Sequence, residues 1–162
     1  MLEEDETDAA WLCGKFTSYL PKIWASRRLK VTTRELRKFL SDSASSSILP
    51  DVNYAELEML SKLHHPNLLM LLGVSAQTSH YTTLTLIFER VAFGSLFSVL
   101  HLKCKRLSSR FVVDTIIQCC SALDFLHTSG FLHCALTSHA VLLISTGYSK
   151  LGCLEYCCSR KR

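Results

Sequence analysis

Residues 56–74 read "ELEMLSKLHHPNLLMLLGV", and within them the apolar pattern changes from helical to extended. Leu57, Leu60 and Leu63 recur every third residue, which places them on one face of a helix. Pro66 marks the end of that helix, because proline disfavours helical backbone in the residue before it. The apolar run that follows is typical of a buried strand. The stretch therefore predicts a helix that leads directly into a sheet.

Further predicted strands lie on both sides of this helix. "WLCGKFTSYLPKIW" at 11–24 and "LKVTTREL" at 29–36 are rich in the aromatic and β-branched residues that strands favour, and basic "ASRR" connects them. "YTTLTLIFE" at 81–89 is a further predicted strand, whereas the polar "SDSASSS" at 41–47 predicts a loop. We expect consecutive antiparallel strands with one helix between them in sequence.

The later part of the chain is mostly helical in pattern. "SLFSVLHLK" at 95–103 has helical spacing, and 108–130 predicts a longer helix with Ser109 as its N-cap and Gly130 as its stop. A hairpin that turns at 146–147 follows. Strands with one helix, followed mainly by helices, predict an α+β fold of two lobes.

Composition and charge exclude several classes of protein. Of the 162 residues 48% are hydrophobic and 20% charged, and the net charge of +4 comes from dispersed Lys and Arg, a pattern of solvated faces rather than of a nucleic-acid site. The acidic start "MLEEDETDAA" lacks the features of a secretory signal. The uncharged stretch 125–149 holds too many Ser, Thr, His and Gly for a membrane span. We expect a cytoplasmic protein with no nucleic-acid partner.

The eight cysteines and seven histidines show no metal-binding spacing. No Cys-x-x-Cys pair occurs, and the adjacent pairs Cys119–Cys120 and Cys157–Cys158 suit neither a tetrahedral metal site nor an ordinary disulfide. In a chain without an export signal, we expect reduced thiols.

Three segments resemble the protein-kinase domain, in register and at the family's intervals. Residues 56–74 look like kinase helix C, continuing through His-Pro-Asn into strand four. "LTLIFERVAFGSL" at 84–96 is similar to the fifth strand, the hinge and the start of helix D, and "ALDFLHTSGFLHCAL" at 122–136 is similar to the end of helix E and the catalytic loop. The resemblance implies a kinase-like two-lobed α+β fold with an acidic tail at 1–10, an N-lobe at 11–91, a partial C-lobe at 92–156 and a basic tail at 157–162.

The resemblance also implies a nucleotide cleft with altered residues. "LCGKFTSY" at 12–19 aligns with the glycine-rich loop and keeps Gly14, but Leu12 and Thr17 replace two of its glycines. Arg34 stands where the phosphate-binding Lys belongs, opposite Glu56 of helix C. The positions that the resemblance assigns to the cleft are Gly14, Arg34, Glu56, the gatekeeper Phe88, the hinge from Glu89 to Val91, and Leu142 beside the adenine with Thr32 above it.

The positions that would carry the chemistry have lost their functional groups. Ala135 occupies the place of the base Asp, Ala140 that of the magnesium-binding Asn, and Cys153 that of the magnesium-binding Asp. Without these oxygens we expect no phosphate transfer and no metal site. His139 is the nearby titratable alternative, and we interpret it as a solvent-facing loop histidine.

Packing positions, by contrast, are kept. By the resemblance, the kinase regulatory spine corresponds to Leu60, Leu71, His133 and Leu154, which suit a buried stack. Retained packing with lost chemistry indicates a pseudokinase that needs no cofactor, although the cleft residues leave room for weak ATP binding. The alternative interpretation is a divergent serine/threonine kinase that still binds ATP.

Among pseudokinases, "GSLFSVLH" at 94–101, "LDFLHTSGFLH" at 123–133 and "KLGCLEY" at 150–156 resemble the testis-expressed inactive kinases of germ-cell intercellular bridges. That resemblance implies a scaffold with protein partners, at the bridge or the midbody, that opposes completion of cytokinesis. Because an activation segment would begin where the sequence stops, we expect a kinase-like fragment with exposed apolar helix surface. A non-functional truncated product is a third interpretation.

Overall fold

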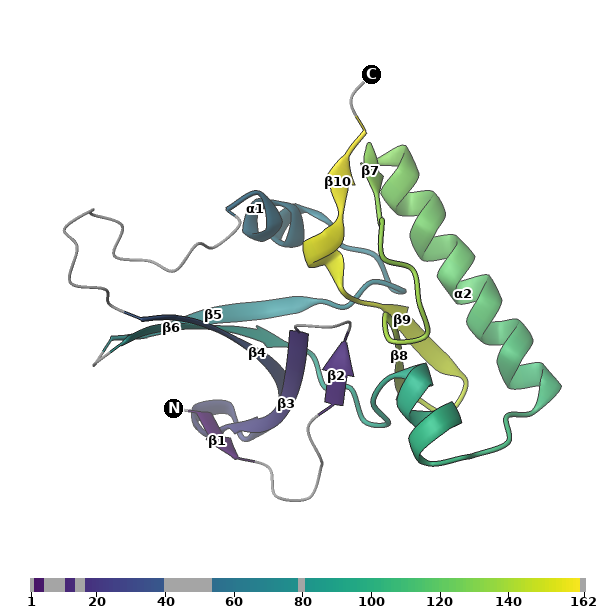
Figure 1. Ribbon diagram of the computed structural model, residues 1–162, viewed down its shortest axis with the longest axis horizontal. Coiled ribbons are helices and arrows are strands. Elements are labelled where there is room, and N and C mark those ends of the chain that lie inside the picture. The colour runs from purple at the N-terminus through teal and green to yellow at the C-terminus, as the bar shows by residue number, and fades with distance from the viewer. Residues whose placement is uncertain (1, 5–10, 14–16, 40–53, 79–80, 161–162) are drawn as a thin grey trace.

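The computed structural model describes residues 2–4, 11–13, 17–39, 54–78 and 81–160. Its larger sheet has the strand order β1-β3-β4-β6-β5, with β2 added to β3, and every pairing in it is antiparallel. The sheet occupies one end of the molecule (Figure 1). Its strands are β1 (Leu2–Glu4), β2 (Trp11–Cys13), β3 (Thr17–Trp24), β4 (Leu29–Phe39), β5 (Leu71–Thr78) and β6 (Tyr81–Phe88).

Strands β3 and β4 are consecutive and antiparallel, as the sequence predicts, and the 3-10 turn η1 (Ala25–Arg27) joins them. Strand β4 then pairs with β6 so that Thr32 lies opposite Phe88 and Arg34 opposite Leu86. Because side chains alternate along a strand, Thr32 and Arg34 share one face of the sheet. The register therefore fixes which β4 residues face the candidate site.

Helix α1 (Tyr54–Lys62) confirms the helix that the leucine spacing predicts. Its Met59 and Leu60 are buried in the main hydrophobic core, and Leu57 and Leu63 pack against that core. The face that carries these residues is turned inward, while Glu58 and Lys62 pair with each other in solvent. Burial of the apolar face holds α1 in place, since so short a helix is marginal in isolation.

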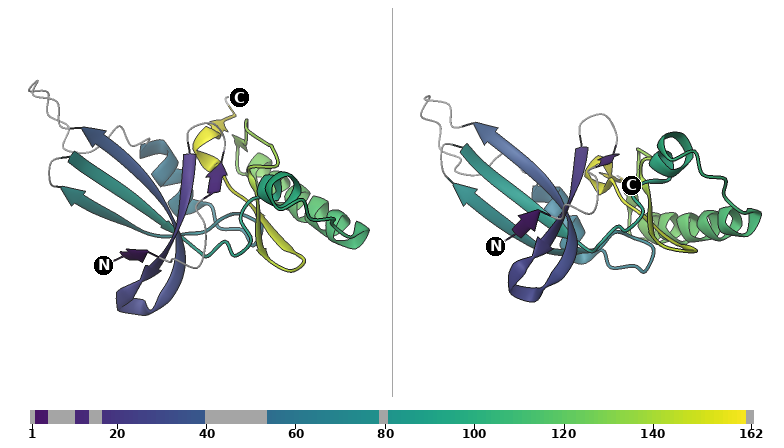
Figure 2. Two further views of the ribbon diagram at one scale, coloured as in Figure 1. Left: turned by 60° about the horizontal axis from the view of Figure 1, so that its bottom comes forward. Right: turned by 90° about the horizontal axis from the view of Figure 1, so that it is seen from below.

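The second half of the chain contains one long helix and two small antiparallel sheets. Figure 2 shows from two further directions that the large sheet and this helix lie at opposite ends of the molecule. The elements are η2 (Ser98–Leu102), a single turn of π-helix, α2 (Ser109–Thr128), β7 (Phe131–Leu132), β8 (Val141–Ser145), β9 (Tyr148–Leu151), the 3-10 turn η3 (Leu154–Tyr156) and β10 (Cys158–Ser159).

The ends of α2 are set by local signals. Ser108, not Ser109, is the N-cap, because its hydroxyl oxygen accepts a hydrogen bond of 3.2 Å from the N–H of Phe111. Gly130 follows the helix with φ of 84°, a conformation that glycine adopts without strain. The predicted β8–β9 hairpin is present, whereas the pairing of β7 with β10 is not apparent from the sequence.

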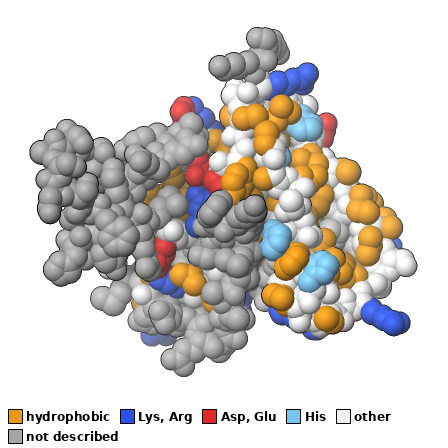
Figure 3. Space-filling view, in the orientation of Figure 1, with side chains coloured by type: hydrophobic (Ala, Val, Ile, Leu, Met, Phe, Trp, Pro, Cys, Tyr) orange, Lys and Arg blue, Asp and Glu red, His pale blue; other side chains and the backbone are white. Residues whose placement is uncertain are grey.

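One face of α2 carries exposed apolar side chains, and Figure 3 shows hydrophobic side chains gathered over this end of the molecule. Val112, Val113, Ile116 and Ile117 are all exposed, although the sequence predicts an apolar face through Val112 and Ile116. The opposite face packs inward through Ala122 and Leu126. Within the described ranges, we find no helix with the length and hydropathy to cross a bilayer.

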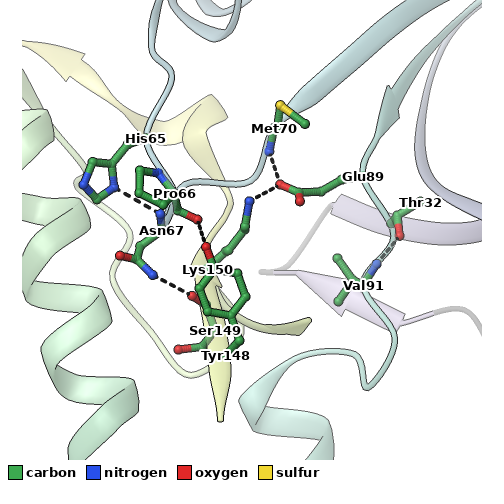
Figure 4. Close-up of polar contacts among 10 residues, drawn as sticks. All are labelled: Thr32, His65, Pro66, Asn67, Met70, Glu89, Val91, Tyr148, Ser149 and Lys150. Carbon is green, nitrogen blue, oxygen red and sulfur yellow. Dashed lines mark hydrogen bonds and ion pairs between the residues drawn. The ribbon is translucent and has the colours of Figure 1, made fainter. Parts of the chain in front are cut away.

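Residues 66–67, which follow α1, form hydrogen bonds with β9 in the second half of the chain (Figure 4). Asn67 Nδ2 donates to the carbonyl of Ser149 at 3.3 Å, and Tyr148 Oη donates to the carbonyl of Pro66 at 2.7 Å. The N–H of Leu151 donates to the carbonyl of Asn67 at 2.8 Å. This network sets β9, and the segment that follows it, against the large sheet.

Candidate functional site

Five side chains from five elements meet where the large sheet faces the segment after β9. Tyr19 comes from β3, Arg34 from β4, Glu56 from α1, Phe88 from β6 and Glu155 from η3. The space that they line has no volume large enough for a water molecule. Protein side chains therefore fill the interior of the site, as they do in a packed core.

Tyr19 is the largest of the fully buried side chains described. Its ring meets that of Phe88 edge to face, with centroids 5.8 Å apart and an interplanar angle of 62°. The backbone of Cys153 hydrogen-bonds to its hydroxyl. Burial, reinforced by the charge of Glu155, raises the pKa of Tyr19, so the phenol keeps its proton at physiological pH. Tyr19 thus bridges β3 to the segment after β9.

Arg34 joins two carboxylates from different elements. Its Nη2 donates to Oε1 of Glu56, and its Nη1 lies 2.7 Å from Oε2 of Glu155. Arg34 and Glu56 are buried, and the side chain of Glu155 is 14% exposed. Two separate nitrogens of one guanidinium therefore connect β4, α1 and η3. The single ammonium group of a lysine would bind the same two carboxylates with poorer geometry.

Arg34 is a cation that contacts two acids in this cluster. Burial raises the pKa of Glu56, Arg34 opposes the rise, and Glu155 adds to it. Although burial lowers the pKa of Arg34, the neighbouring Tyr19, Glu155 and Glu56 raise it by more, so the guanidinium stays charged.

In the segment after β6, the N–H of Val91 and the carboxylate of Glu89 both have hydrogen-bond partners within the protein (Figure 4). The N–H of Val91 donates to Oγ1 of Thr32 at 2.9 Å. Oε1 of Glu89 accepts from the N–H of Met70 at 2.8 Å and from Nζ of Lys150 at 2.6 Å. Both Thr32 and Val91 are buried, so their hydrogen bond is shielded from water.

The loop that follows β7 is held by His133. Its Nε2 is 2.8 Å from the carbonyl of Gly152, so this nitrogen carries the proton, and its Nδ1 accepts from the N–H of Ala135 at 3.3 Å. Burial lowers the pKa of His133, although the hydrogen bond to Gly152 opposes the shift. The neutral imidazole therefore satisfies both neighbours at once.

Ala140 and Gly152 are packed tightly at the base of the site. Ala140 is fully buried, and its carbonyl accepts from the N–H of Gly152 at 2.8 Å. A Cβ on Gly152 would lie 2.6 Å from Cδ1 of the fully buried Leu142, so no larger residue fits there without displacement of Leu142.

Comparisons with known proteins identify this arrangement. The model of the family of protein tyrosine and serine/threonine kinases matches residues 13–154. The chain belongs to the protein kinase family. It is 35% identical over 156 residues to the inactive serine/threonine-protein kinase TEX14 of Mus musculus, with 94% of this chain and 11% of that protein covered, and equally identical to that of Bos taurus, of which 10% is covered.

A relative whose name does not describe it as inactive has a lower sequence identity to this chain. Mitogen-activated protein kinase kinase kinase 13 of Homo sapiens is 29% identical over 116 residues, which cover 72% of this chain and 12% of that protein. The chain thus spans about a tenth of the length of the curated relatives that it matches. The family membership confirms the two-lobed α+β kinase-like fold that the sequence predicts.

The kinase positions can now be compared with the geometry. Magnesium prefers carboxylate and amide oxygens, but Ala135, Ala140 and Cys153 offer none at the three positions where the resemblance expects a base or metal ligand. Cys153 is disulfide-bonded, so the expectation of reduced thiols is wrong for this residue. Of the remaining acids, Glu56 and Glu155 are engaged by Arg34. The described residues at these three positions do not fit a magnesium ion.

Most residues predicted for the cleft come together. Arg34, Glu56 and Phe88 line the filled space, and Glu89 and Val91 lie in the segment that follows β6. Leu142 lies in the same hydrophobic core as Phe88. Gly14 lies outside the described residues. Whether any of these residues contacts a nucleotide stays a prediction. The loop residue His139 stacks on Phe97, with ring centroids 3.9 Å apart, and is half-buried rather than solvent-facing.

The sequence reasoning did not single out Tyr19 or Lys150. A signal for Tyr19 exists, because "LCGKFTSY" places a large aromatic residue where the kinase pattern has a small valine. Its position against Phe88 depends on the pairing of β3 with β4 and of β4 with β6. No local pattern marks Lys150, whose role depends on contact with Glu89, 61 residues away.

Proposed function

We propose that this chain is a non-catalytic, kinase-like interaction module whose cleft is closed by its own side chains. The observation that carries the proposal is the burial of Tyr19 against Phe88, in a space that admits no water. A phosphate group that approached Arg34 would have to displace this packed ring first. Removal of a large buried side chain from a core costs several kcal/mol, about 3–5 for an aromatic residue.

The absence of phosphate transfer is the second part of the proposal. Catalysis of this reaction rests on positioning and on charge stabilisation by magnesium and a base. Ala135, Ala140 and Cys153 supply neither, and Arg34 is held between two carboxylates instead of facing an open pocket. The names of the TEX14 relatives, which describe inactive kinases, support this reading.

The third part is that the module acts through protein partners. Exposed apolar patches on soluble proteins are typical of interaction sites, and α2 presents Val112, Val113, Ile116 and Ile117 to solvent. The resemblance to inactive kinases of germ-cell intercellular bridges supports a scaffold role in cytoplasm, at the bridge or the midbody. The proposed scaffold role requires no cofactor.

The catalytic part is tested by a phosphate-transfer assay. Purified chain, and a longer parent that contains it, are incubated with magnesium and γ-labelled ATP, with a generic substrate and without one. We expect no label in either protein or substrate above that of a heat-denatured sample. Turnover that an Arg34→Ala variant removes would overturn the proposal and favour a divergent kinase.

The cellular part is tested by localisation. A tagged chain expressed in dividing male germ cells is expected to concentrate at intercellular bridges. The double variant Ile116→Ser, Ile117→Ser removes two exposed apolar side chains without touching the core, so it should remain folded and lose that concentration. A diffuse wild-type distribution, or equal concentration of the variant, contradicts the scaffold role.

A further inference from the structure

Two exposed cysteines meet beside the strand pair β7–β10. Strand β10 pairs with β7 through Cys158 opposite Leu132 and Ser159 opposite Phe131, and the N–H of Arg160 extends the pairing to the carbonyl of Gly130 at 2.7 Å. Cys134 lies two residues after the end of β7. This arrangement brings Sγ of Cys134 to within 3.1 Å of Sγ of Cys158, and both thiols are free and exposed.

The distance between these sulfurs is short enough for bond formation with little rearrangement. A disulfide has a sulfur–sulfur distance of about 2.05 Å, so the two atoms need to approach by only about 1 Å more. Cys134 lies in a loop and Cys158 in a two-residue strand near the end of the chain. A shift of this size is well within what such segments accommodate.

Cys157 is an alternative disulfide partner for Cys158, but the geometry of a Cys157–Cys158 bond is less favourable than that of a Cys134–Cys158 bond. It is adjacent to Cys158, and consecutive Cα atoms are about 3.8 Å apart, below the span of about 4.4–6.8 Å that ordinary disulfides need. Its side chain packs against the hydrophobic core. Burial, with smaller contributions from neighbouring thiols and acids, raises the pKa of Cys157 to about 12, which keeps it protonated and unreactive.

We propose that Cys134 and Cys158 are a redox-modification site, at which a peroxide converts the two thiols into a reversible intramolecular disulfide. The thiolate of one cysteine attacks a peroxide oxygen, which forms a sulfenic acid and releases hydroxide, taken up as water. The second thiolate then attacks the sulfenic sulfur, which forms the S–S bond and releases a second hydroxide. The thiols lose two electrons and two protons, and hydrogen peroxide is reduced to two waters.

The bond would join two parts of the candidate site. Cys134 precedes Ala135 in the loop that His133 holds, and Cys158 lies three residues after Glu155, which binds Arg34. A cross-link across the 24-residue separation restricts the unfolded chain. The oxidised chain therefore holds η3 and its Glu155 against the loop more firmly than the reduced chain does.

The test is a map of disulfides in the full chain before and after hydrogen peroxide. Remaining thiols are blocked with an alkylating reagent, and the chain is digested without reductant by trypsin and chymotrypsin. Cleavage at Phe131 or Leu132 separates Cys134 from the cysteines of α2, and cleavage after Tyr156 separates Cys158 from Cys153. We expect a peroxide-dependent peptide pair that joins Cys134 to the 157–158 segment and disappears on reduction with dithiothreitol.

Matched serine variants assign the bond. Cys134→Ser and Cys158→Ser should each abolish the linked pair, while Cys157→Ser should leave its yield unchanged. All three variants keep a side chain of similar size, and circular dichroism checks that each one folds. The wild-type map stands independently of the variants: absence of the linked pair after peroxide, or its persistence in Cys158→Ser, overturns the proposal.

Discussion

The backbone N–H of Val91 donates a hydrogen bond of 2.9 Å to the hydroxyl of Thr32. By the kinase resemblance, Val91 belongs to the hinge that would bind adenine. A donor that already has a buried partner offers a ligand little, because the ligand must first break an existing hydrogen bond. The proposed closure of the cleft thus includes this hinge contact, the packing of Tyr19 on Phe88, and the ion pairs of Arg34 with Glu56 and Glu155.

Loss of the Thr32 hydroxyl should destabilise the fold. Thr32→Val keeps the shape of the side chain but leaves the buried N–H of Val91 without its acceptor, which costs about 1–3 kcal/mol. Urea denaturation measures the change in the free energy of unfolding. Thr146→Val makes the same chemical change at an exposed threonine and should stay within about 0.5 kcal/mol. Equal effects for both variants would contradict the role of the hydrogen bond.

Truncation of Tyr19 should open the site at a cost in stability. Tyr19→Ala removes a fully buried ring, and we expect a loss of about 3–5 kcal/mol in the free energy of unfolding. Tyr19→Phe keeps the ring against Phe88 and loses the hydroxyl with its hydrogen bond to Cys153, so it should lose about 1 kcal/mol. A Tyr19→Ala variant as stable as Tyr19→Phe would show that the ring is not packed.

Replacement of Arg34 should be costly because it removes the cation that buried Glu56 and partly buried Glu155 both contact. We expect Arg34→Met to lose about 3–5 kcal/mol in the free energy of unfolding. Arg34→Lys restores the family residue but offers one nitrogen in place of two, so it should lose about 1–3 kcal/mol and gain no activity. The exposed pair of Arg110 with Asp114 provides the control, and Arg110→Met should leave stability unchanged.

Stability should fall in mild acid because of His133. Burial lowers its pKa below the ordinary 6.5, so below pH 6.5 the unfolded chain binds a proton that the folded imidazole resists. The contribution is complete above pH 6.5 and is lost as the pH falls through the folded pKa, with a slope of at most about 1.4 kcal/mol per pH unit. In His133→Phe this slope should disappear, whereas exposed His127→Gln should retain it. An unaltered slope in His133→Phe would rule out this residue as the cause.

The elements of the fold were predictable because local periodicity encodes them. The leucines of 56–74 give α1, and the aromatic and β-branched runs give β3 and β4. The pairing of Arg34 with Glu56 was implied by the kinase resemblance and is present. By contrast, the short pair β7–β10 has no sequence pattern, since two residues carry no measurable period.

The proposed closure of the cleft was harder to predict, because the contacts that support it join distant strands. Thr32 and Val91 are 59 residues apart, and their hydrogen bond depends on the register of β4 against β6. A register shift of one residue would turn Thr32 and Arg34 to the other face of the sheet. The altered cleft residues were evident from the sequence, but not that Tyr19 fills the space.

Thermal unfolding with and without magnesium–ATP tests the closed cleft most directly. A ligand at one hundred times its Kd stabilises a fold by about 2.7 kcal/mol, which raises the Tm of a chain of this size by about 5–10 °C. At about 1 mM magnesium–ATP, a site with a Kd of about 10 μM would give this full rise. The filled cleft predicts no change in Tm for the wild-type chain. A magnesium-dependent rise of several degrees would contradict it.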